Sequence, residues 1–251
     1  IRPRDWSSDV CSSDLSDWLG SPSFQLPLRQ PSLAFSDKET FEPTTSLIIQ
    51  RLFIDGLRIL IPSLIALSSV ILGAMGFSAI FRFGGNRALI FLAPILVLGL
   101  GWLSAFLVIA LKWSIMGRFR PTIKPLWSRY VWWNELVNGA YESIMAPAMA
   151  FYLGTPMISL FLRAIGCKIG KYTHIATTLF SEFDLVKIQD HASLNHGAVI
   201  QNHLVEDRIF KSSHLSIGEY CSVGNMSVVL YDSEMKTGSR LGPLSLLMKG
   251  R

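Results

Sequence analysis

The stretch IGEYCSVGNMSVVLYDSEMKTGSRLGPLSLL, Ile217–Leu247, has a strict six-residue rhythm. An aliphatic residue or Met opens each unit, at Ile217, Val223, Val229, Met235, Leu241 and Leu247. A small residue follows four positions later, at Cys221, Ser227, Ser233, Ser239 and Ser245. A six-residue period is typical of parallel β-helices, and it excludes a heptad coiled coil, whose period is seven.

The same spacing continues upstream of this stretch. Two further runs keep it, Ile188, Leu194 and Ile200, and then Ile169 and Ile175. Glycine directly follows four of the repeat residues, at Gly170, Gly218, Gly224 and Gly242. We expect a coil of short parallel strands over residues 165–251, in which aliphatic side chains stack inward, small residues fit the corners and glycine eases the turns.

The rhythm breaks once inside this region. Ile200 and Ile217 are seventeen positions apart, one short of three units, and residues 204–216 between them are rich in polar side chains. A regular coil is filled inside and flat outside, whereas a loop beside it forms a wall and therefore a cleft. We expect a loop over 204–216 and a site next to it.

The composition indicates membrane segments. Half of the 251 residues are apolar, 16% are charged and the mean hydropathy is +0.38, which is more apolar than a typical soluble domain. Two uncharged runs, Ile59–Phe81 and Ala88–Leu111, flank the segment RFGGNR, and each is long enough to cross the ~30 Å hydrocarbon layer. They predict a transmembrane helix pair over 56–112, in contact with lipid. Lys and Arg on the outer flanks place both ends, and the coil, in the cytoplasm.

A third uncharged stretch, 143–162, is interrupted by Pro147, Gly154 and Pro156. A third crossing would move the coil to the other side of the membrane, but the interruptions favour short interfacial or amphipathic helices over 113–164. The net charge of +5 fits membrane flanks. Because the sequence has no basic patch interleaved with aromatic residues, no nucleic-acid partner is predicted.

The N-terminal part differs from the rest. Residues 5–15, DWSSDVCSSDL, resemble the translation of a sequencing adapter, so residues 1–15 are expected to be an artefact, with a natural tail as the alternative. Residues 16–46 are rich in Ser, Pro and Thr, and a linker is predicted over 16–55. The cysteines Cys11, Cys167 and Cys221 form no disulfide framework and no CxxC motif, which favours reduced thiols.

The repeat resembles the left-handed parallel β-helix of hexapeptide acyltransferases. The segments LGTPMISLFLRAIGCKIGKYTHI, SEFDLVKIQDHASLN, IQNHLVEDRIFK and LGPLSLLMKG are similar to the terminal region of the ε-poly-lysine synthetase family and related membrane-bound nonribosomal peptide synthetases. The resemblance covers about residues 40–251. It implies a transmembrane helix pair followed by a left-handed β-helix that forms amide bonds from carrier-bound aminoacyl thioesters.

The resemblance also implies partners. The sequence has no phosphate-binding GxxxxGK loop and no evident carrier serine motif, so adenylation and carrier domains are expected in cis or in trans. The chain itself is predicted to bind no cofactor or metal, and the acyl donor would be linked to phosphopantetheine on another domain. Hexapeptide acyltransferases form trimers, which implies neighbouring β-helix units in a trimer-like assembly.

The resemblance assigns the general base of such a reaction to a histidine. His203 stands just before the break and is the first candidate, with Asp207 or Glu206 orienting its ring and a backbone N–H stabilising the oxyanion. His196 is the second candidate. His203 can also be read as a solvent-facing turn residue. The segment Glu182–Asp184 either binds a cationic substrate or is a solvated turn, and the turn is favoured. His174, His191 and His214 are expected at the surface.

Two other functions remain open. The coil could be a non-catalytic scaffold on the membrane that docks other modules. It could also be a metal enzyme of the γ-carbonic anhydrase kind, whose zinc needs three histidines. His191 and His196 have a suitable spacing for such a site, but no third His lies about two coils upstream.

Overall fold

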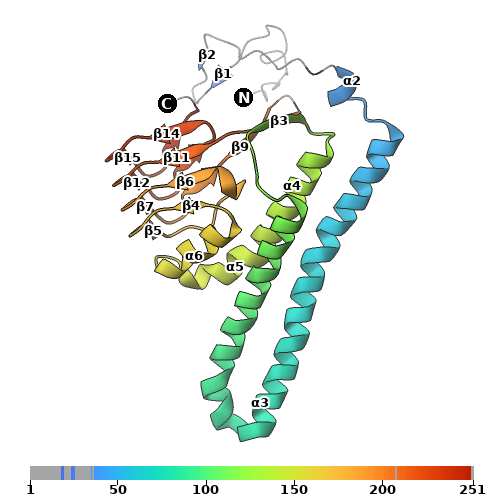
Figure 1. Ribbon diagram of the computed structural model, residues 1–251, viewed down its shortest axis with the longest axis vertical. Helices are drawn as coiled ribbons and strands as arrows, with labels where there is room; N and C mark the ends of the chain where they lie inside the picture. The colour runs from blue at the N-terminus through green and yellow to red at the C-terminus, as the bar shows by residue number, and fades with distance from the viewer. Residues whose placement is uncertain (1–17, 20–23, 26–34, 36, 207, 250–251) are drawn as a thin grey trace, which may run out of the picture. The chain divides into compact units, whose positions relative to one another are not determined.

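The computed structural model describes residues 18–19, 24–25, 35, 37–206 and 208–249 (Figure 1). The chain forms two compact units, Ile1–Ser36 and Asp37–Arg251. In the first unit, β1 (Trp18–Leu19) pairs antiparallel with β2 (Phe24–Gln25). The predicted artefact at residues 1–15 lies outside the described residues. Everything below concerns the second unit.

The second unit begins with α2 (Asp37–Thr40) and the long α3 (Thr45–Ile115). The Thr44 side chain caps α3 by accepting a hydrogen bond from Leu47 N. The helix therefore begins inside the predicted linker 16–55, ahead of the predicted span. Apolar residues dominate this early part of α3 as well, and they extend the helix toward the N-terminus.

Two glycines turn α3 back on itself. Gly84 and Gly85 are non-helical, and Gly85 has φ 57° and ψ −149°, a conformation that is essentially restricted to glycine. Figure 1 shows the two arms of α3 side by side from this point, and Ser69 Oγ lies 3.0 Å from Ser104 Oγ across them. The predicted six-residue connection is thus a two-residue break.

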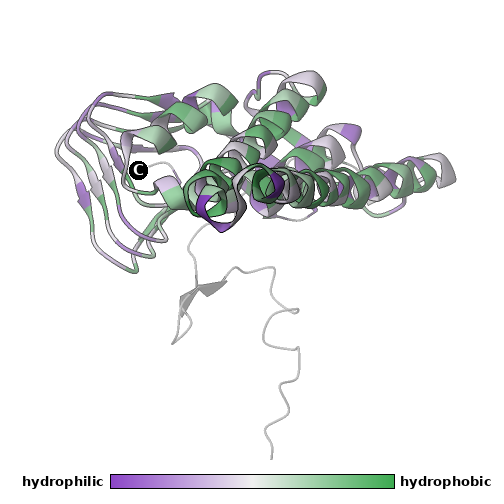
Figure 2. Cartoon of the chain, turned by 90° about the horizontal axis from the view of Figure 1, so that it is seen from below, coloured by the Kyte–Doolittle hydropathy of each residue, from purple (hydrophilic) through white to green (hydrophobic). Residues whose placement is uncertain are grey.

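Many apolar side chains on both arms of α3 are exposed, and Figure 2 shows that hydrophobic residues dominate the helix. Among the described helices, α3 is the one whose length and composition are sufficient to cross a membrane. The outward faces of its arms therefore have no packing partner within the described chain.

Short helices connect α3 to the coil. They are α4 (Arg129–Ala140), the π-helix η1 (Tyr141–Met145), α5 (Ala146–Met149), the 3₁₀ helix η2 (Ala150–Tyr152) and α6 (Pro156–Ile165). No continuous helix covers 143–162, and the ten residues of α6 span only about 15 Å. The buried face of α6 contacts the first strands of the coil, β4 and β5. The stretch 143–162 therefore packs as broken helices.

The coil consists of three parallel sheets (Figure 1). The first contains β4 (Lys168–Ile169), β6 (Val186–Ile188), β11 (Leu215–Ile217) and β14 (Ser233–Met235). The second contains β5 (His174–Ile175), β7 (Ser193–Leu194), β12 (Ser222–Val223) and β15 (Arg240–Leu241). The third contains β8 (Val199–Gln201), β13 (Val228–Leu230) and β16 (Leu246–Leu247). The chain visits the three sheets in turn, so each circuit forms one rung.

The repeat residues stack from rung to rung. Ile217 is the Cα partner of Met235, and Val223 is the partner of Leu241, so one rung takes eighteen residues, or three six-residue units. The repeat residues from Ile188 to Met235 are almost fully buried, and this burial is the main stabilising contribution of the repeat. The left-handed sense of the β-helix, which the sequence predicts, stays a prediction.

Glycine after a repeat residue has a different role from the expected one. A Cβ on Gly218 would lie 2.6 Å from Met235 O, and one on Gly224 would lie 2.5 Å from Pro243 N. Neither glycine has positive φ. They are needed because the next rung passes too close for any side chain, whereas the left-handed corner positions carry larger residues such as His191 and Tyr220.

The break in the rhythm is a β-hairpin. β9 (His203–Glu206) pairs antiparallel with β10 (Ile209–Ser212), and β10 pairs antiparallel with β3 (Thr122–Pro125), which follows α3. The predicted loop 204–216 is therefore shorter and more ordered than expected, because β11 already begins at Leu215. The strand β3 covers the outer edge of the hairpin.

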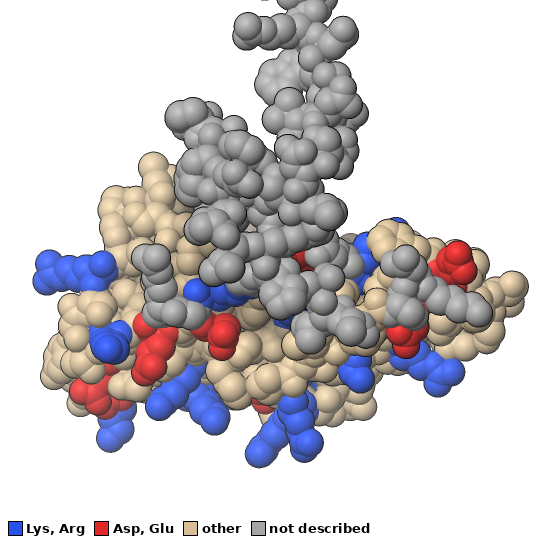
Figure 3. All heavy atoms as spheres, turned by 90° about the horizontal axis from the view of Figure 1, so that it is seen from above, with Lys and Arg blue, Asp and Glu red and all other residues tan. Residues whose placement is uncertain are grey.

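Charge is mixed over the visible surface. Figure 3 shows Lys and Arg side chains interspersed with Asp and Glu on the face seen from above, where the atoms in grey leave it open. On that part of the described surface, positive charge is not gathered into a stripe of the kind that tracks a nucleic-acid backbone.

Candidate functional site

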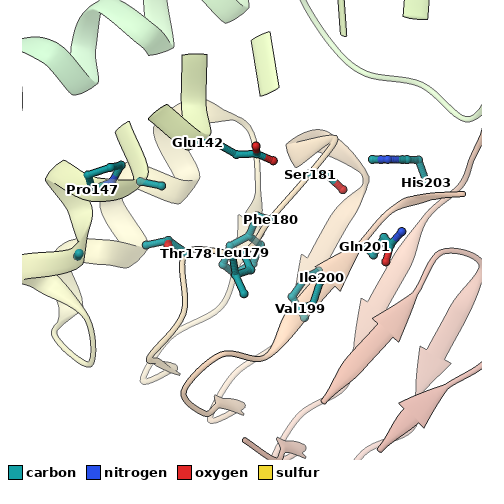
Figure 4. Close-up of a pocket in the computed structure, with 12 residues that line it drawn as sticks. Glu142, Pro147, Thr178, Leu179, Phe180, Ser181, Val199, Ile200, Gln201 and His203 are labelled. Carbon is teal, nitrogen blue, oxygen red and sulfur yellow. The ribbon is translucent and has the colours of Figure 1, made fainter. Parts of the chain in front are cut away.

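A cavity of about 580 Å³ lies between the short helices and the third sheet. Figure 4 shows Glu142 and Pro147 on its helical side, with Ile200 and His203 on the sheet side. Twelve residues line it, namely Glu142, Ala146, Pro147, Ala150, Thr178, Leu179, Phe180, Ser181, Val199, Ile200, Gln201 and His203. Most of this lining is apolar, and Glu142 and His203 are its two ionisable residues. Such a hollow, with a few polar groups, suits a small polar substrate.

The position of His203 follows from the end of β8 and the start of the hairpin. Asn202 is buried, and its backbone N–H donates to Ser181 Oγ at 3.2 Å while its side-chain amide donates to Ser213 O at 3.3 Å. These bonds close the base of the hairpin. The ring of His203 stacks on Phe210 of β10, with centroids 5.0 Å apart. The imidazole is therefore held from two sides.

A buried carboxylate orients this imidazole. Nδ1 of His203 lies 2.8 Å from Oε2 of Glu182. An ionised carboxylate only accepts hydrogen bonds, so Nδ1–H donates and Nε2 is left for a substrate. The Glu182 side chain is 0% exposed, whereas that of His203 is 28% exposed. The carboxylate of Glu182 is therefore shielded from solvent, whereas the imidazole of His203 is accessible.

The other oxygen of Glu182 is satisfied by helix α4. Oε1 accepts from Nδ2 of Asn134 at 2.8 Å and from Nδ2 of Asn138 at 3.2 Å. The two asparagines are four residues apart and so share one face of the helix. Glu182 itself has φ 36° and ψ 58°, an unusual conformation for a residue other than glycine that the surrounding contacts must hold in place. Helix α4 therefore fixes the carboxylate that fixes the histidine.

Electrostatics make His203 a stronger base. Burial by itself lowers the pKa of His203, but the hydrogen bond and negative charge of Glu182 outweigh it, with smaller contributions from Glu142 and Glu135. The net effect is a pKa above the ordinary 6.5. A histidine with such a pKa accepts a proton readily near neutral pH.

The structure changes the prediction of the orienting carboxylate. Asp207 lies outside the described residues. Glu206 does not contact His203, because its Oε2 accepts from Lys211 Nζ at 2.8 Å across the hairpin. The lysine also lowers the pKa of Glu206. Among the described residues, Glu182 and not Glu206 is the carboxylate that contacts His203, and the predicted role of Asp207 stays a prediction.

The expectation that Glu182–Asp184 forms a solvated turn is wrong. Glu182 is fully buried, and Asp184 Oδ2 accepts from Lys112 Nζ at 2.6 Å and from Phe119 N at 3.0 Å. Lys112 is itself fully buried near the end of α3. The two acidic residues therefore connect the coil to α4 and to α3.

The remaining histidines lie away from this pair. His196, the second candidate, is exposed in the turn between β7 and β8 and does not line the cavity. His174, His191 and His214 are exposed, as expected. In the described part of the chain, no three His, Cys, Asp or Glu side chains form a group that could hold a metal ion.

A signal for Glu182 was present in the sequence. Glu182 precedes His203 by 21 positions, and the rung that ends near His203 follows its predecessor after 19 residues, since Ile169 pairs with Ile188. A residue about one rung upstream of a coil residue is its neighbour in space. Two acidic residues, Glu182 and Asp184, lie about one rung upstream of His203, and the spacing alone does not tell them apart. Nothing in the spacing indicates Asn134, Asn138 or Glu142.

A histidine that is oriented by a buried carboxylate at the wall of a cavity is the arrangement of a general base. It lies beside a coil of parallel strands, on a chain with a helix suited to a membrane.

The chain is similar to the δ-poly-L-ornithine synthetase of Acinetobacter baumannii strain AB307-0294, with 36% identity over 242 residues. The matched region covers 94% of this chain and 18% of that protein. The chain is thus homologous to a segment of a poly-amino-acid synthetase, and at this level the predicted resemblance is confirmed. No family model and no solved structure matches the chain.

Proposed function

We propose that this chain is a membrane-anchored condensation unit of a poly-amino-acid synthetase, which joins an amine to a carrier-bound aminoacyl thioester. The observation that carries the proposal is the His203–Glu182 pair at the wall of the cavity. The similarity to a poly-amino-acid synthetase supports amide-bond formation as the reaction.

In the proposed reaction, the amine nitrogen attacks the thioester carbonyl carbon while Nε2 of His203 takes a proton from it. The C–N bond forms, the C–S bond breaks, and the proton on Nε2 passes to the leaving sulfur, so no acyl-enzyme is needed. Glu182 stabilises the imidazolium that forms between these two transfers.

The architecture supports the location of the reaction. We propose that the coil is a left-handed β-helix of the hexapeptide type, that the arms of α3 cross the membrane, and that the coil faces the cytoplasm. The acyl donor would arrive on the phosphopantetheine of a carrier domain, charged by an adenylation domain. The name of the relative suggests ornithine, a cationic diamino acid, as the unit that is joined.

The test is the change of His203 to Ala. The chain, purified in lipid nanodiscs, would be supplied with the N-acetylcysteamine thioester of ornithine and free ornithine, and the dipeptide would be measured by mass spectrometry. The loss of a general base is expected to lower the rate by about 10² to 10⁴. His196→Ala is the matched control, since this histidine is exposed and outside the cavity. A folded His203→Ala protein with full activity would disprove the catalytic role of His203, whereas a folded wild-type chain without activity would favour the scaffold.

A further inference from the structure

We propose that Glu142 forms a subsite for an ammonium group, which holds the amino group of the acceptor that does not react. This inference rests on the proposed function, since it names how the same cavity recognises a diamino acid. Glu142 would determine how the acceptor binds and which of its amino groups reacts, whereas His203 would transfer the proton.

Glu142 differs from its neighbours in having no cationic partner among the described residues. Glu135, about two helical turns earlier, accepts from Arg51 at 2.6 Å and from Arg58 at 3.0 Å. Glu182 is hydrogen-bonded to His203 and to two asparagines. No ion pair or hydrogen bond joins the Glu142 carboxylate to another described residue. Its negative charge is therefore available to a ligand.

The cavity gives this charge a defined place. Glu142 and His203 are its two ionisable lining residues, and Figure 4 shows them apart, with Ser181 between them in the view. The walls near Glu142 are the apolar Ala146 and Pro147. Glu142 is itself exposed, so an incoming cation can reach it, and salt would screen the interaction in part.

The helix that carries Glu142 is firmly anchored. Glu142 belongs to the π-helix η1, a distortion that is frequent at functional sites. On either side of it, Tyr141 and Met145 are fully buried. The Tyr141 hydroxyl donates to Thr178 O at 2.7 Å, which ties the helix to the loop that leads to Glu182. The carboxylate thus stands on a rigid wall of the cavity.

The chemistry of a diamine requires two different groups at such a site. One amino group must lose its proton in order to attack, and a base serves that purpose. The other remains an ammonium, and a carboxylate stabilises it. A bound ammonium would also offset the negative charge of Glu142, which is one of the charges that raise the pKa of His203. Binding of the acceptor would then favour the neutral, base-competent form of the imidazole.

The experiment compares ornithine with two monoamines that each keep one of its amino groups, 5-aminopentanoate and norvaline, as acceptors in the nanodisc assay. The reacting monoamine is the one that keeps the amino group that attacks the thioester. We expect the wild-type chain to have a higher kcat/KM for ornithine than for this monoamine. Glu142→Gln should lower kcat/KM for ornithine by about three- to tenfold, mainly through KM, because the charge-assisted contact is removed. The value for the reacting monoamine should change far less, only through the small effect of Glu142 on the pKa of His203. Glu142→Asp should recover part of the preference.

Two controls separate this proposal from the proposed function. Glu234→Gln changes an exposed carboxylate on β14 outside the cavity and should have no effect. Calorimetric affinities for ornithine and the monoamines, measured on His203→Ala and on the His203→Ala/Glu142→Gln double variant, need no turnover. If Glu142→Gln leaves the ratio of ornithine to monoamine unchanged in rate and in affinity, the ammonium subsite is disproved. If His203→Ala keeps full activity while Glu142→Gln still lowers the preference for ornithine, His203 is not the general base but the ammonium subsite is supported.

Discussion

Two regions of the coil differ in how their strands are packed, the regular rungs after the hairpin and the rung that the hairpin interrupts. In the part of the coil from β11 to β14, the repeat residues are buried and apolar or small, and neighbouring backbones approach so closely that glycine is required at Gly218 and Gly224. In the rung that ends at β8, the hairpin opens the coil, and the buried residues include Glu182, Asn202 and Lys211. Regular stacking leaves no room for a substrate, so the candidate site lies where the stacking is interrupted.

The difference also lies in what supports each region. The regular rungs are held by contacts with the rungs above and below. The interrupted rung depends on segments from elsewhere in the chain, namely β3 at the edge of the hairpin and α4 against Glu182. Polar groups that are buried in this way are costly unless every partner is present. A substitution should therefore damage activity in the interrupted rung and stability in the regular rungs.

Among the substitutions that test the difference between the two regions, Glu182→Gln is expected to have the largest effect on the condensation rate. The amide keeps the shape of the carboxylate but not its charge, so the ring of His203 loses its orientation and its support as an imidazolium. We expect condensation to slow by about 10²-fold and the free energy of unfolding to fall by about 1.5 to 3 kcal/mol. Rates and urea unfolding would measure both.

The matched control for this change is Glu206→Gln. Glu206 is partly exposed and pairs with Lys211 away from His203, so its loss should cost under about 1 kcal/mol and little activity. If Glu206→Gln impairs catalysis as much as Glu182→Gln does, the assignment of the orienting carboxylate is wrong.

The reverse behaviour is expected in a regular rung. Ile217 is fully buried and stacks between Ile188 and Met235. Ile217→Ala should lower the free energy of unfolding by about 2 to 5 kcal/mol because it leaves a cavity. The rate per folded molecule should stay near that of the wild type. Active-site titration alongside thermal unfolding would check this, and a large loss in the rate of the folded fraction would show that the two regions are not separate.

The smallest effect concerns pH. The pKa of His203 is raised, and the imidazole must be neutral to act as a base, so the rate should rise as the pH increases through this raised value. In Glu182→Gln, burial remains while the hydrogen bond to a charged group is lost, so this limb of the profile should move to lower pH. Condensation rates measured from about pH 5 to about pH 9, a range around the ordinary histidine pKa of ~6.5, would show the shift. An unchanged pH profile in Glu182→Gln would contradict the assignment of Glu182 as the partner of His203.

Stability should respond to pH through the same pair. A pKa that is higher in the folded than in the unfolded chain means that the folded state binds the proton more tightly. The stabilisation by His203 and Glu182 is therefore fully present below the ordinary pKa of 6.5 and is lost as the pH rises through the raised value. The difference in unfolding free energy between the wild type and Glu182→Gln should shrink accordingly over that interval.

The sequence by itself determined the period of the coil, its buried positions, the apolar arms of α3 and the region where the site lies. These features are local or periodic, so composition and spacing are enough to reveal them. The tertiary structure decided which carboxylate faces His203, because rung stacking brings Glu182 beside a residue 21 positions later while the nearby Glu206 turns to Lys211. It also decided that Asn134 and Asn138 donate hydrogen bonds to Glu182 and that Glu142 lines the cavity. The packing of the helices on the coil follows no sequence period, so the sequence alone does not predict these contacts.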